Sequence, residues 1–281
     1  MPAQKPITLT VSVVVYDTDT GQLHALLESL LTALAALPAV GLQVVTHISL
    51  VDNSEQQRLR LADFAGFRTR LKTRHAVLNL VTGHGNVGYG RGHNLVIHSH
   101  DHHYHLILNP DVELAADSLA VGLFYLEQHP QVALVSPSAV AGDGDKQHLC
   151  KRDPSVFTLV IRGFCPAWLK KLFSERLAHY EMHDLPEDRP STGIPHASGC
   201  CMLCRAEALR GVKGFDDKYF LYFEDFDLSR RLSRQGWVVY LPAMKIRHHG
   251  GNAAGKGLAH IAMYTRSAWR FFNTWGWRLI Q

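Results

Sequence analysis

The sequence predicts an α/β fold in which a mostly parallel central sheet is flanked by helices. Three observations indicate this class: apolar runs of strand length alternate with helix-like segments over the first 110 residues, acidic residues follow several of these runs, and hydrophobic residues make up 46% of the 281 residues. Such alternation is typical of a parallel sheet covered by helices. Functional residues of these folds gather at the carboxyl ends of the strands.

The first half of the chain contains most of the predicted sheet. Strands are predicted at residues 9–16, 43–51, 76–81, 104–108 and 132–136, and helices at residues 21–37, 58–67 and 117–129. Asp17, Asp52 and Asp111 each follow one of these strands closely. We therefore expect the three carboxylates at one edge of the sheet.

The second half of the chain is less regular. Between residues 141 and 195 the sequence is rich in Gly, Pro and charge, and an amphipathic stretch at 168–180 is the clearest pattern. Regularity returns with an apolar strand at 200–204, the block 214–236 and a strand at 237–241. Leu228 and Leu232 lie four residues apart, which predicts an amphipathic helix with acidic residues in its first turn.

The composition limits the classes of partner and compartment. A net charge of +4 is too small and too dispersed for a nucleic-acid groove, so we expect no nucleic-acid partner. The five cysteines are an odd number, and Cys200, Cys201 and Cys204 are interpreted as buried reduced thiols. The early apolar run at 9–16 is too short to span a bilayer and lacks the features of a secretory signal, so we expect a cytoplasmic protein.

The acidic pair Glu224 and Asp225 is the first candidate site. Aromatic residues surround the pair at positions 219, 220, 222, 223 and 226. A carboxylate among aromatic rings loses solvation, so its pKa rises and it becomes a better general base near neutral pH. The alternative is structural, because acidic residues in the first turn of a helix also complement the helix dipole.

Two further motifs offer ligands for a cation or a phosphate. Asn109, Pro110 and Asp111 end a strand, where a carboxylate can hold a divalent cation, although the same residues are common in turns. His248 and His249 stand before two glycines, Gly250 and Gly251, and a neutral imidazole can bind metal or phosphate. The alternative is that these are two ordinary surface histidines among the 18 of the chain.

Other clusters admit less specific interpretations. Residues 83–88 match the G-x-G-x-x-G pattern, and Asp111 follows at the distance that a dinucleotide fold uses, so a NAD-dependent oxidoreductase is an alternative. The loop follows the third predicted strand rather than the first, and this position disfavours the NAD-dependent oxidoreductase. The histidines between 98 and 105 are interpreted as a solvated helix end and turn.

Taken together, these motifs resemble glycosyltransferase family 2, in particular its rhamnosyltransferase-like branch, from about Thr10 to Trp277. The resemblance rests on the order of several segments: Ser12 to Asp17, Val51 to Ser54, Asn86 to Asn94, Asn109 to Asp111, Ala197 to Leu203, Gly214 to Asp216, Tyr222 to Leu228, and His248 to Gly250. It implies a GT-A fold with an acceptor-binding, helical region towards the C-terminus. The implied domain covers 1–255, with a nucleotide-sugar half over about 1–140 and an acceptor half over about 141–255, followed by an aromatic and basic helical segment over 256–281.

The resemblance also implies roles for individual residues. Asp225 is the catalytic base, with Glu224 beside it for the acceptor or for orientation. The residues implied to bind the nucleotide sugar are Tyr16, Asp17, Asp52, Asn53, Asn86, Gly88, Arg91, Asn94, Asn109 and Asp111. Those implied to bind or orient the acceptor are Gly199, Tyr222 and Asp227. Those implied to hold a divalent cation, Mg²⁺ or Mn²⁺, are Asp111, His248 and His249.

Two departures from the family pattern modify this expectation. The first strand ends in Tyr16-Asp17 where the family usually has Tyr-Asn, which affects the nucleobase contact. The motif at Asp111 carries one carboxylate instead of two. A single carboxylate predicts weak cation affinity, with the diphosphate of the donor supplying much of the coordination.

The implied reaction is the transfer of a sugar, with inversion, to a glycan or lipid-linked glycan. The reaction would serve the synthesis of a bacterial surface polysaccharide such as O-antigen, and rhamnose from dTDP-rhamnose is the first choice of donor. A UDP-hexosyl or galactofuranosyl transferase and a non-catalytic sugar-binding module are the alternatives. The aromatic and basic residues from Met263 to Arg278 either rest in a lipid headgroup layer at the inner face of the cytoplasmic membrane or pack on the catalytic domain.

Overall fold

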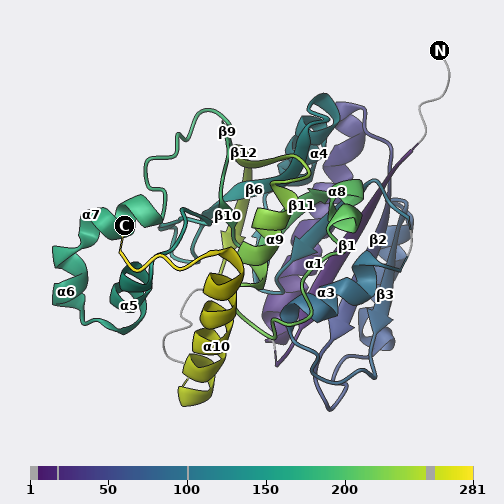
Figure 1. Cartoon of the computed structure of the whole chain (residues 1–281). Coiled ribbons are helices and arrows are strands. Elements are labelled where there is room, and N and C mark those ends of the chain that lie inside the picture. The colour runs from purple at the N-terminus through teal and green to yellow at the C-terminus, as the bar shows by residue number, and fades with distance from the viewer. Residues whose placement is uncertain (1–5, 18, 100, 251–256, 281) are drawn as a thin grey trace.

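The computed structural model describes residues 6–17, 19–99, 101–250 and 257–280, and its centre is a mixed, mostly parallel sheet (Figure 1). Eight strands lie in the order β3-β2-β1-β4-β11-β6-β12-β5. Their bounds are β1 Ile7–Val15, β2 Val44–Asp52, β3 Ala76–Val81, β4 Tyr104–Leu108, β5 Val112–Leu114, β6 Val132–Val140, β11 Cys201–Arg205 and β12 Trp237–His248. Two short strands, β7 Lys146–Gln147 and β9 Ser191–Thr192, pair with β6 and β12.

The strand directions bring several chain segments to one edge. Strands β3, β2, β1 and β4 run parallel, and β6 runs parallel to β12, whereas β11 is antiparallel to both β4 and β6. Consequently the residues after β1, β2, β3 and β4 meet at the same edge. The expected α/β class with a mostly parallel sheet is confirmed.

Both faces of the sheet are covered, because successive strand residues point to opposite sides. Leu106 and Leu108 of β4 pack with the apolar residues of α1 (Thr20–Ala36), α2 (Ala65–Lys72) and α4 (Ser118–Gln128). Ile107 packs on the other side with α3 (Tyr89–Ile97), α8 (Ala206–Gly211) and α9 (Glu224–Leu232). The chain also forms two 3-10 turns, η1 Leu37–Val40 and η2 Leu61–Phe64.

Helix α1 is long and apolar enough to cross a membrane by length and composition. Its leucines at positions 23, 26, 27, 30 and 34 are nevertheless buried in the core against the sheet. Asp19 begins the helix, because its side chain accepts a hydrogen bond of 3.0 Å from the backbone N–H of Gln22. Burial of its leucines therefore accounts for the apolar character of α1.

A second group of helices lies beside the sheet. It contains α5 (Val156–Phe164), α6 (Ala167–Leu172) and α7 (Ser174–Tyr180), close to a two-stranded sheet of β8 (Cys150–Lys151) and β10 (His196–Ala197). Helix α10 (Leu258–Trp275), yellow in Figure 1, runs between this group and the rest of the molecule, and the C-terminal residues pass over α5. The amphipathic stretch predicted at 168–180 corresponds to α6 and α7, whereas α5 was not predicted.

Two predicted elements have different boundaries in the structure. The helix predicted at 58–67 begins as a 3-10 turn at Leu61 and continues to Lys72. The strand predicted at 237–241 continues to His248 through Pro242. A register shift between Leu241 and Lys245 accommodates the proline, which lacks a backbone donor.

The histidines between 98 and 105 fall into two groups: His98, at the end of α3, and His103 are exposed, as predicted, whereas the other two described ones are not part of a solvated turn. His102 and His105 are buried, and Ser12 Oγ lies within 2.8 Å of both His93 Nδ1 and His105 Nε2. His105 Nδ1 in turn lies 3.0 Å from His102 Nε2. His102 and His105 were misassigned because polar side chains that hydrogen bond to one another can be buried without a hydrophobic pattern. His100 lies outside the described residues.

The three cysteines after Gly199 are buried free thiols, as expected.

Candidate active site

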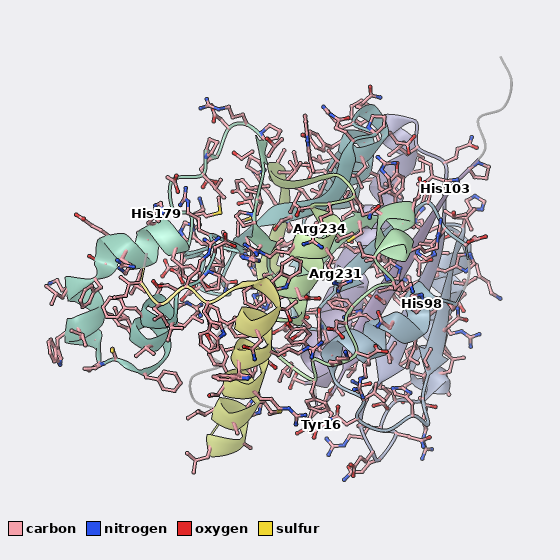
Figure 2. All side chains as sticks on the ribbon, viewed as in Figure 1. Tyr16, His98, His103, His179, Arg231 and Arg234 are labelled. Carbon is pink, nitrogen blue, oxygen red and sulfur yellow. The ribbon has the colours of Figure 1, made fainter. Side chains whose placement is uncertain are left out.

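A cleft of about 650 Å³ lies at the carboxyl ends of β1, β2 and β4. In Figure 2 Tyr16 marks this end of the sheet, while His103, before β4, lies at the opposite end. Seven of the predicted donor-binding residues line the cleft: Tyr16, Asp17, Asn53, Asn86, Gly88, Asn109 and Asp111. The far wall comes from Phe220, Leu221, His260 and Met263, none of which was predicted to bind the donor.

Gly88 joins the two walls of the cleft. Its φ is +89°, and a Cβ atom there would lie 2.4 Å from the carbonyl oxygen of Phe220. Asn86 accepts the N–H of Gly88 at 3.1 Å, and the side chain of Asn53 donates to the carbonyl of Gly88 at 2.9 Å. The glycine loop is therefore fixed by side chains from two strand ends.

The residues expected to contact the nucleobase divide into two groups. Tyr16 is 58% exposed at the mouth of the cleft, and Asp17, with a φ of +51°, forms an ion pair with Arg58. Asp52 is buried, and its two oxygens accept backbone N–H groups of Ser54 at 2.9 Å and of Leu59 at 3.0 Å. Asp52 thus shapes the loop beside the cleft rather than lining it.

Arg91 and Asn94 lie on α3 but do not line the donor cleft. Asn94 accepts the N–H of Phe215 and donates to the carbonyl of the same residue, each at 2.9 Å, and Arg91 donates to the carbonyl of Asp217. Both side chains hold the segment before α9 against α3. Their contacts position the acidic pair indirectly.

Asp111, which lines the cleft, lies close to His248. His248 Nε2 lies 3.5 Å from Asp111 Oδ1, which is buried and has no hydrogen-bond partner among the described residues. Gln147, a residue that the sequence did not suggest, lies on the other side of the imidazole: its Oε1 is 2.8 Å from His248 Nδ1, and its Nε2 donates to the carbonyls of His248 and Gly250.

These contacts fix the tautomer of His248. The amide nitrogen of Gln147 is used by two carbonyls, so its oxygen must face Nδ1, and Nδ1 must carry the proton. The lone pair of Nε2 is then directed at the Asp111 carboxylate. Burial lowers the pKa of His248, although the Asp111 charge opposes this effect, so the neutral form is favoured.

This arrangement fits a divalent cation with two protein ligands. A carboxylate oxygen and an imidazole nitrogen that both present lone pairs across 3.5 Å repel each other unless a cation lies between them. His249 does not join them, because its Nε2 is hydrogen bonded to Glu113. Within the described residues no group of three or more His, Cys, Asp or Glu side chains could hold a metal ion. Gly251 lies outside the described residues.

Glu224 and Asp225 begin α9 directly after two residues with positive φ, Tyr222 at +70° and Phe223 at +63°. Asp225 accepts the N–H of Gly199 and the N–H of Phe226, each at 2.9 Å. Glu224 is buried, and its Oε2 has no hydrogen-bond partner among the described residues. The adjacent carboxyl groups therefore have different environments.

These environments separate the roles of the pair. Burial, and then the neighbouring Asp225 charge, raise the pKa of Glu224 well above its usual value. Burial also raises the pKa of Asp225, but two backbone donors stabilise its charged form. We infer that Asp225 is the ionised member and Glu224 the protonated one, as expected when two carboxyl groups interact closely.

Tyr89 connects the acidic pair to the donor cleft. Its hydroxyl donates to the carbonyl of Gly199 at 2.6 Å, while the N–H of Gly199 binds Asp225. Burial raises the pKa of Tyr89 well above its usual value, and the nearby charges of Asp225 and Asp111 add to this effect. Tyr89 belongs to the Asn86–Asn94 motif, but its aromatic character gave no sign of a role at the site.

Two residues predicted to bind or orient the acceptor have other contacts. Asp227 is buried, and it accepts the N–H groups of Arg231 Nε at 2.7 Å and of Trp275 Nε1 at 3.0 Å, which attaches α10 to α9. The Tyr222 hydroxyl lies 2.8 Å from His260 Nδ1 of α10. Both residues position the helix that supplies the far wall of the cleft.

Comparison with known proteins assigns the family. The sequence profile described as glycosyltransferase like family 2 matches residues 6–266, so the chain belongs to glycosyltransferase family 2 and is a glycosyltransferase. The NAD-dependent alternative is therefore wrong. The glycine loop that suggested it ends at Gly88, which begins α3 beside the cleft.

Two curated relatives are rhamnosyltransferases. The N-acetylglucosaminyl-diphospho-decaprenol L-rhamnosyltransferase of Mycobacterium tuberculosis is 31% identical over 59% of this chain and 53% of its own length. The rhamnosyltransferase WbbL of Escherichia coli is 27% identical over 62% of this chain and 65% of its own length. The matches thus span between about half and two thirds of these relatives.

Solved structures confirm the GT-A fold. GalNAc-T7 with UDP, GalNAc and Mn²⁺ superposes with a TM-score of 0.63 at 12% identity, over 97% of this chain and 48% of that one. Residues 1–349 of Staphylococcus aureus TarS with UDP-GlcNAc superpose with a TM-score of 0.56 at 12% identity, over 95% of this chain and 67% of that one. At these identities the likeness concerns the fold alone.

Proposed function

We propose that this glycosyltransferase transfers rhamnose from dTDP-rhamnose to a lipid-linked glycan, with inversion, in bacterial surface polysaccharide synthesis such as O-antigen. The observation that carries the proposal is the similarity to two rhamnosyltransferases, one of which is named for a diphospho-decaprenol acceptor. The cleft beside Tyr16 and Asp111 offers room for the donor. A lipid-linked acceptor implies a cytoplasmic enzyme at the inner face of the membrane.

The chemistry follows from the two carboxyl groups and the cation ligands. Asp225 takes the proton from the acceptor hydroxyl as the hydroxyl oxygen forms its bond to the anomeric carbon. The bond between that carbon and the diphosphate oxygen breaks on the opposite side, and the nucleoside diphosphate leaves with the electron pair. Mg²⁺ or Mn²⁺ held by Asp111 and His248 would neutralise the charge that develops on the diphosphate.

Protonated Glu224 supports the transfer of the acceptor proton to Asp225. A neutral carboxyl beside Asp225 avoids a second buried charge and can donate a hydrogen bond to the acceptor. Gly199 contributes the N–H that keeps Asp225 ionised and oriented. Together these groups account for a base that is available near neutral pH.

A second candidate is a UDP-sugar transferase, favoured by the solved neighbours that bind UDP or UDP-GlcNAc. The test is release of nucleoside diphosphate from dTDP-, UDP- and GDP-sugars, with Mg²⁺, with Mn²⁺ and with neither. Turnover of dTDP-rhamnose above all others supports the proposal. Preferred turnover of a UDP-sugar would assign a UDP-sugar as the donor instead. Binding of a nucleotide sugar without turnover across a broad acceptor panel would indicate a non-catalytic module.

A further inference from the structure

An apolar groove of about 170 Å³ opens between α5 and α10. Val160 and Phe164 of α5 line one side, Trp269 and Phe272 of α10 the other, and Trp277 of the C-terminal segment also lines the groove. Trp269 is 61% exposed, Phe164 is 54% exposed and Trp277 is 45% exposed. The groove is smaller than a typical pocket for a drug-sized ligand. Its size suits part of a hydrocarbon chain that enters from the interior of a bilayer.

Ring contacts and backbone hydrogen bonds connect the walls of the groove. The Trp269 and Trp277 rings meet edge to face at 4.8 Å, and Trp277 stacks on Phe272 at 5.2 Å. The backbone N–H groups of Val156 and Phe157 donate to the carbonyls of Arg278 and Leu279, so the C-terminal segment is tied to the first turn of α5. Leu279 and Ile280 remain exposed beyond this point.

The sequence around the groove has an unusual balance of charge. Residues 156–172 and 258–280 contain no Asp or Glu but six cations: Arg162, Lys170, Lys171, Arg266, Arg270 and Arg278. Arg162, Arg270 and Arg278 pair with acids of other segments. Lys170, Lys171 and Arg266 have no ion-pair partner in the described ranges, so their charge is available to an anionic surface.

Tryptophan is concentrated in the same two segments. They contain four of the five tryptophans of the chain, Trp168, Trp269, Trp275 and Trp277, and the fifth is Trp237. Tryptophan prefers the boundary between water and hydrocarbon, and Lys and Arg bind anionic headgroups there. These two segments combine exposed aromatic side chains with unpaired cations and contain no acidic residue. This combination fits an anionic bilayer better than a partner protein, which would need acidic residues to pair with the cations.

We propose that the groove between α5 and α10 docks on an anionic phospholipid bilayer and admits an acyl or isoprenoid chain, with Lys170 and Lys171 of α6 and Arg266 of α10 supplying the positive charge. Helix α10 also carries His260 and Met263, which line the donor cleft. Docking through its outer side therefore fixes the cleft at the membrane surface. The inference deepens the proposed function, because a lipid-linked acceptor would lie in the same bilayer.

The test is co-sedimentation of the full chain with phosphatidylcholine vesicles, with and without phosphatidylglycerol. We expect binding to the anionic vesicles, at least tenfold weaker in the double variant Phe164→Glu/Trp269→Glu. Lys171→Glu/Arg266→Glu should weaken binding to anionic vesicles and remove its salt dependence. Trp237→Glu, at a tryptophan of similar exposure on β12, should bind like the wild type.

Thermal unfolding verifies that each variant is folded. Equal binding by the wild type and Phe164→Glu/Trp269→Glu overturns the proposal, as does absence of wild-type binding. The proposal is also overturned if the wild type is a dimer, Trp269→Glu is a monomer, and lipid affects neither protein. That result would show that the groove serves self-association. Because the assay needs neither donor nor acceptor, its failure leaves the reaction class intact, and a wrong donor leaves the docking surface intact.

Discussion

His248 Nε2 and Asp111 Oδ1 lie 3.5 Å apart with the tautomer of the imidazole set from behind by Gln147. The imidazole therefore presents a lone pair to a carboxylate, an arrangement that a cation stabilises. Partners that orient a metal-binding histidine in this way typically contribute 10- to 100-fold to metal affinity. Gln147 is thus a positioning residue for the proposed cation site.

Gln147→Leu should weaken Mn²⁺ binding about 10- to 100-fold, because His248 loses the acceptor that fixes Nδ1–H. The measurement is Mn²⁺ titration followed by electron paramagnetic resonance, in the presence of a nucleoside diphosphate. Gln128→Leu, at an exposed position at the end of α4, is the matched control and should not change the titration. Unchanged affinity in Gln147→Leu would show that His248 is not held for a cation.

Asp225→Asn should lower kcat about 10²- to 10⁴-fold and leave donor binding intact, because the amide cannot accept the proton of the acceptor hydroxyl. Steady-state release of nucleoside diphosphate and calorimetric binding of the donor measure the two effects. Asp188→Asn, at an exposed acid, is the control. Wild-type turnover in Asp225→Asn would assign the base to another residue.

The pH profile provides an independent check of Asp225. Because burial raises the pKa of this carboxyl above the usual aspartate value, kcat should fall on the acid side at a higher pH than for an exposed aspartate. A profile of kcat against pH, with stability monitored at each point, measures this limb. An acid limb at the ordinary aspartate pKa would mean that Asp225 is solvated in the working enzyme.

Glu224→Gln should change the pH dependence of stability. The folded state raises the pKa of Glu224, so it binds more protons than the unfolded chain above the ordinary glutamate pKa. Wild-type stability is therefore fully present below pH of about 4.5 and decreases as the pH rises through the folded-state pKa. Thermal unfolding across this range should show a smaller decrease in Glu224→Gln. Parallel curves for the two proteins would contradict a buried, protonated Glu224.

The parts of the fold that follow from local pattern were predicted well. The strands at 76–81 and 104–108 agree with β3 and β4 to the residue, because both are continuous apolar or alternating runs bounded by turns. The strand ending at His248 was cut short at Pro242, since a bulge that tolerates proline depends on the partner strand β6. Long-range pairing of this kind leaves no local signal.

The site shows the same division. Asp111 and Asp225 follow from motifs at the ends of elements, whereas Gln147 comes from a two-residue strand that is recognisable only through its pairing with β6. Asp227 was predicted to serve the acceptor, yet its carboxylate is hydrogen bonded to Arg231 of its own helix and to Trp275 of α10. A carboxylate in the first turn of a helix looks the same in sequence whether it faces a substrate or another helix.

Gly88→Ala should damage the cleft, because the new Cβ would lie 2.4 Å from the carbonyl oxygen of Phe220 and the backbone φ of +89° disfavours any side chain. The Phe220 wall must shift, so the affinity for the nucleoside diphosphate should fall and the free energy of unfolding should decrease by about 1–3 kcal/mol. Gly66→Ala is the matched control: Gly66 lies in α2, a Cβ atom there would meet nothing within 4 Å, and helical alanine is favoured over glycine by about 0.5–1 kcal/mol. Calorimetric titration with dTDP and UDP and chemical unfolding of both variants measure these effects. Full affinity in Gly88→Ala would mean that the Phe220 wall takes no part in binding the donor.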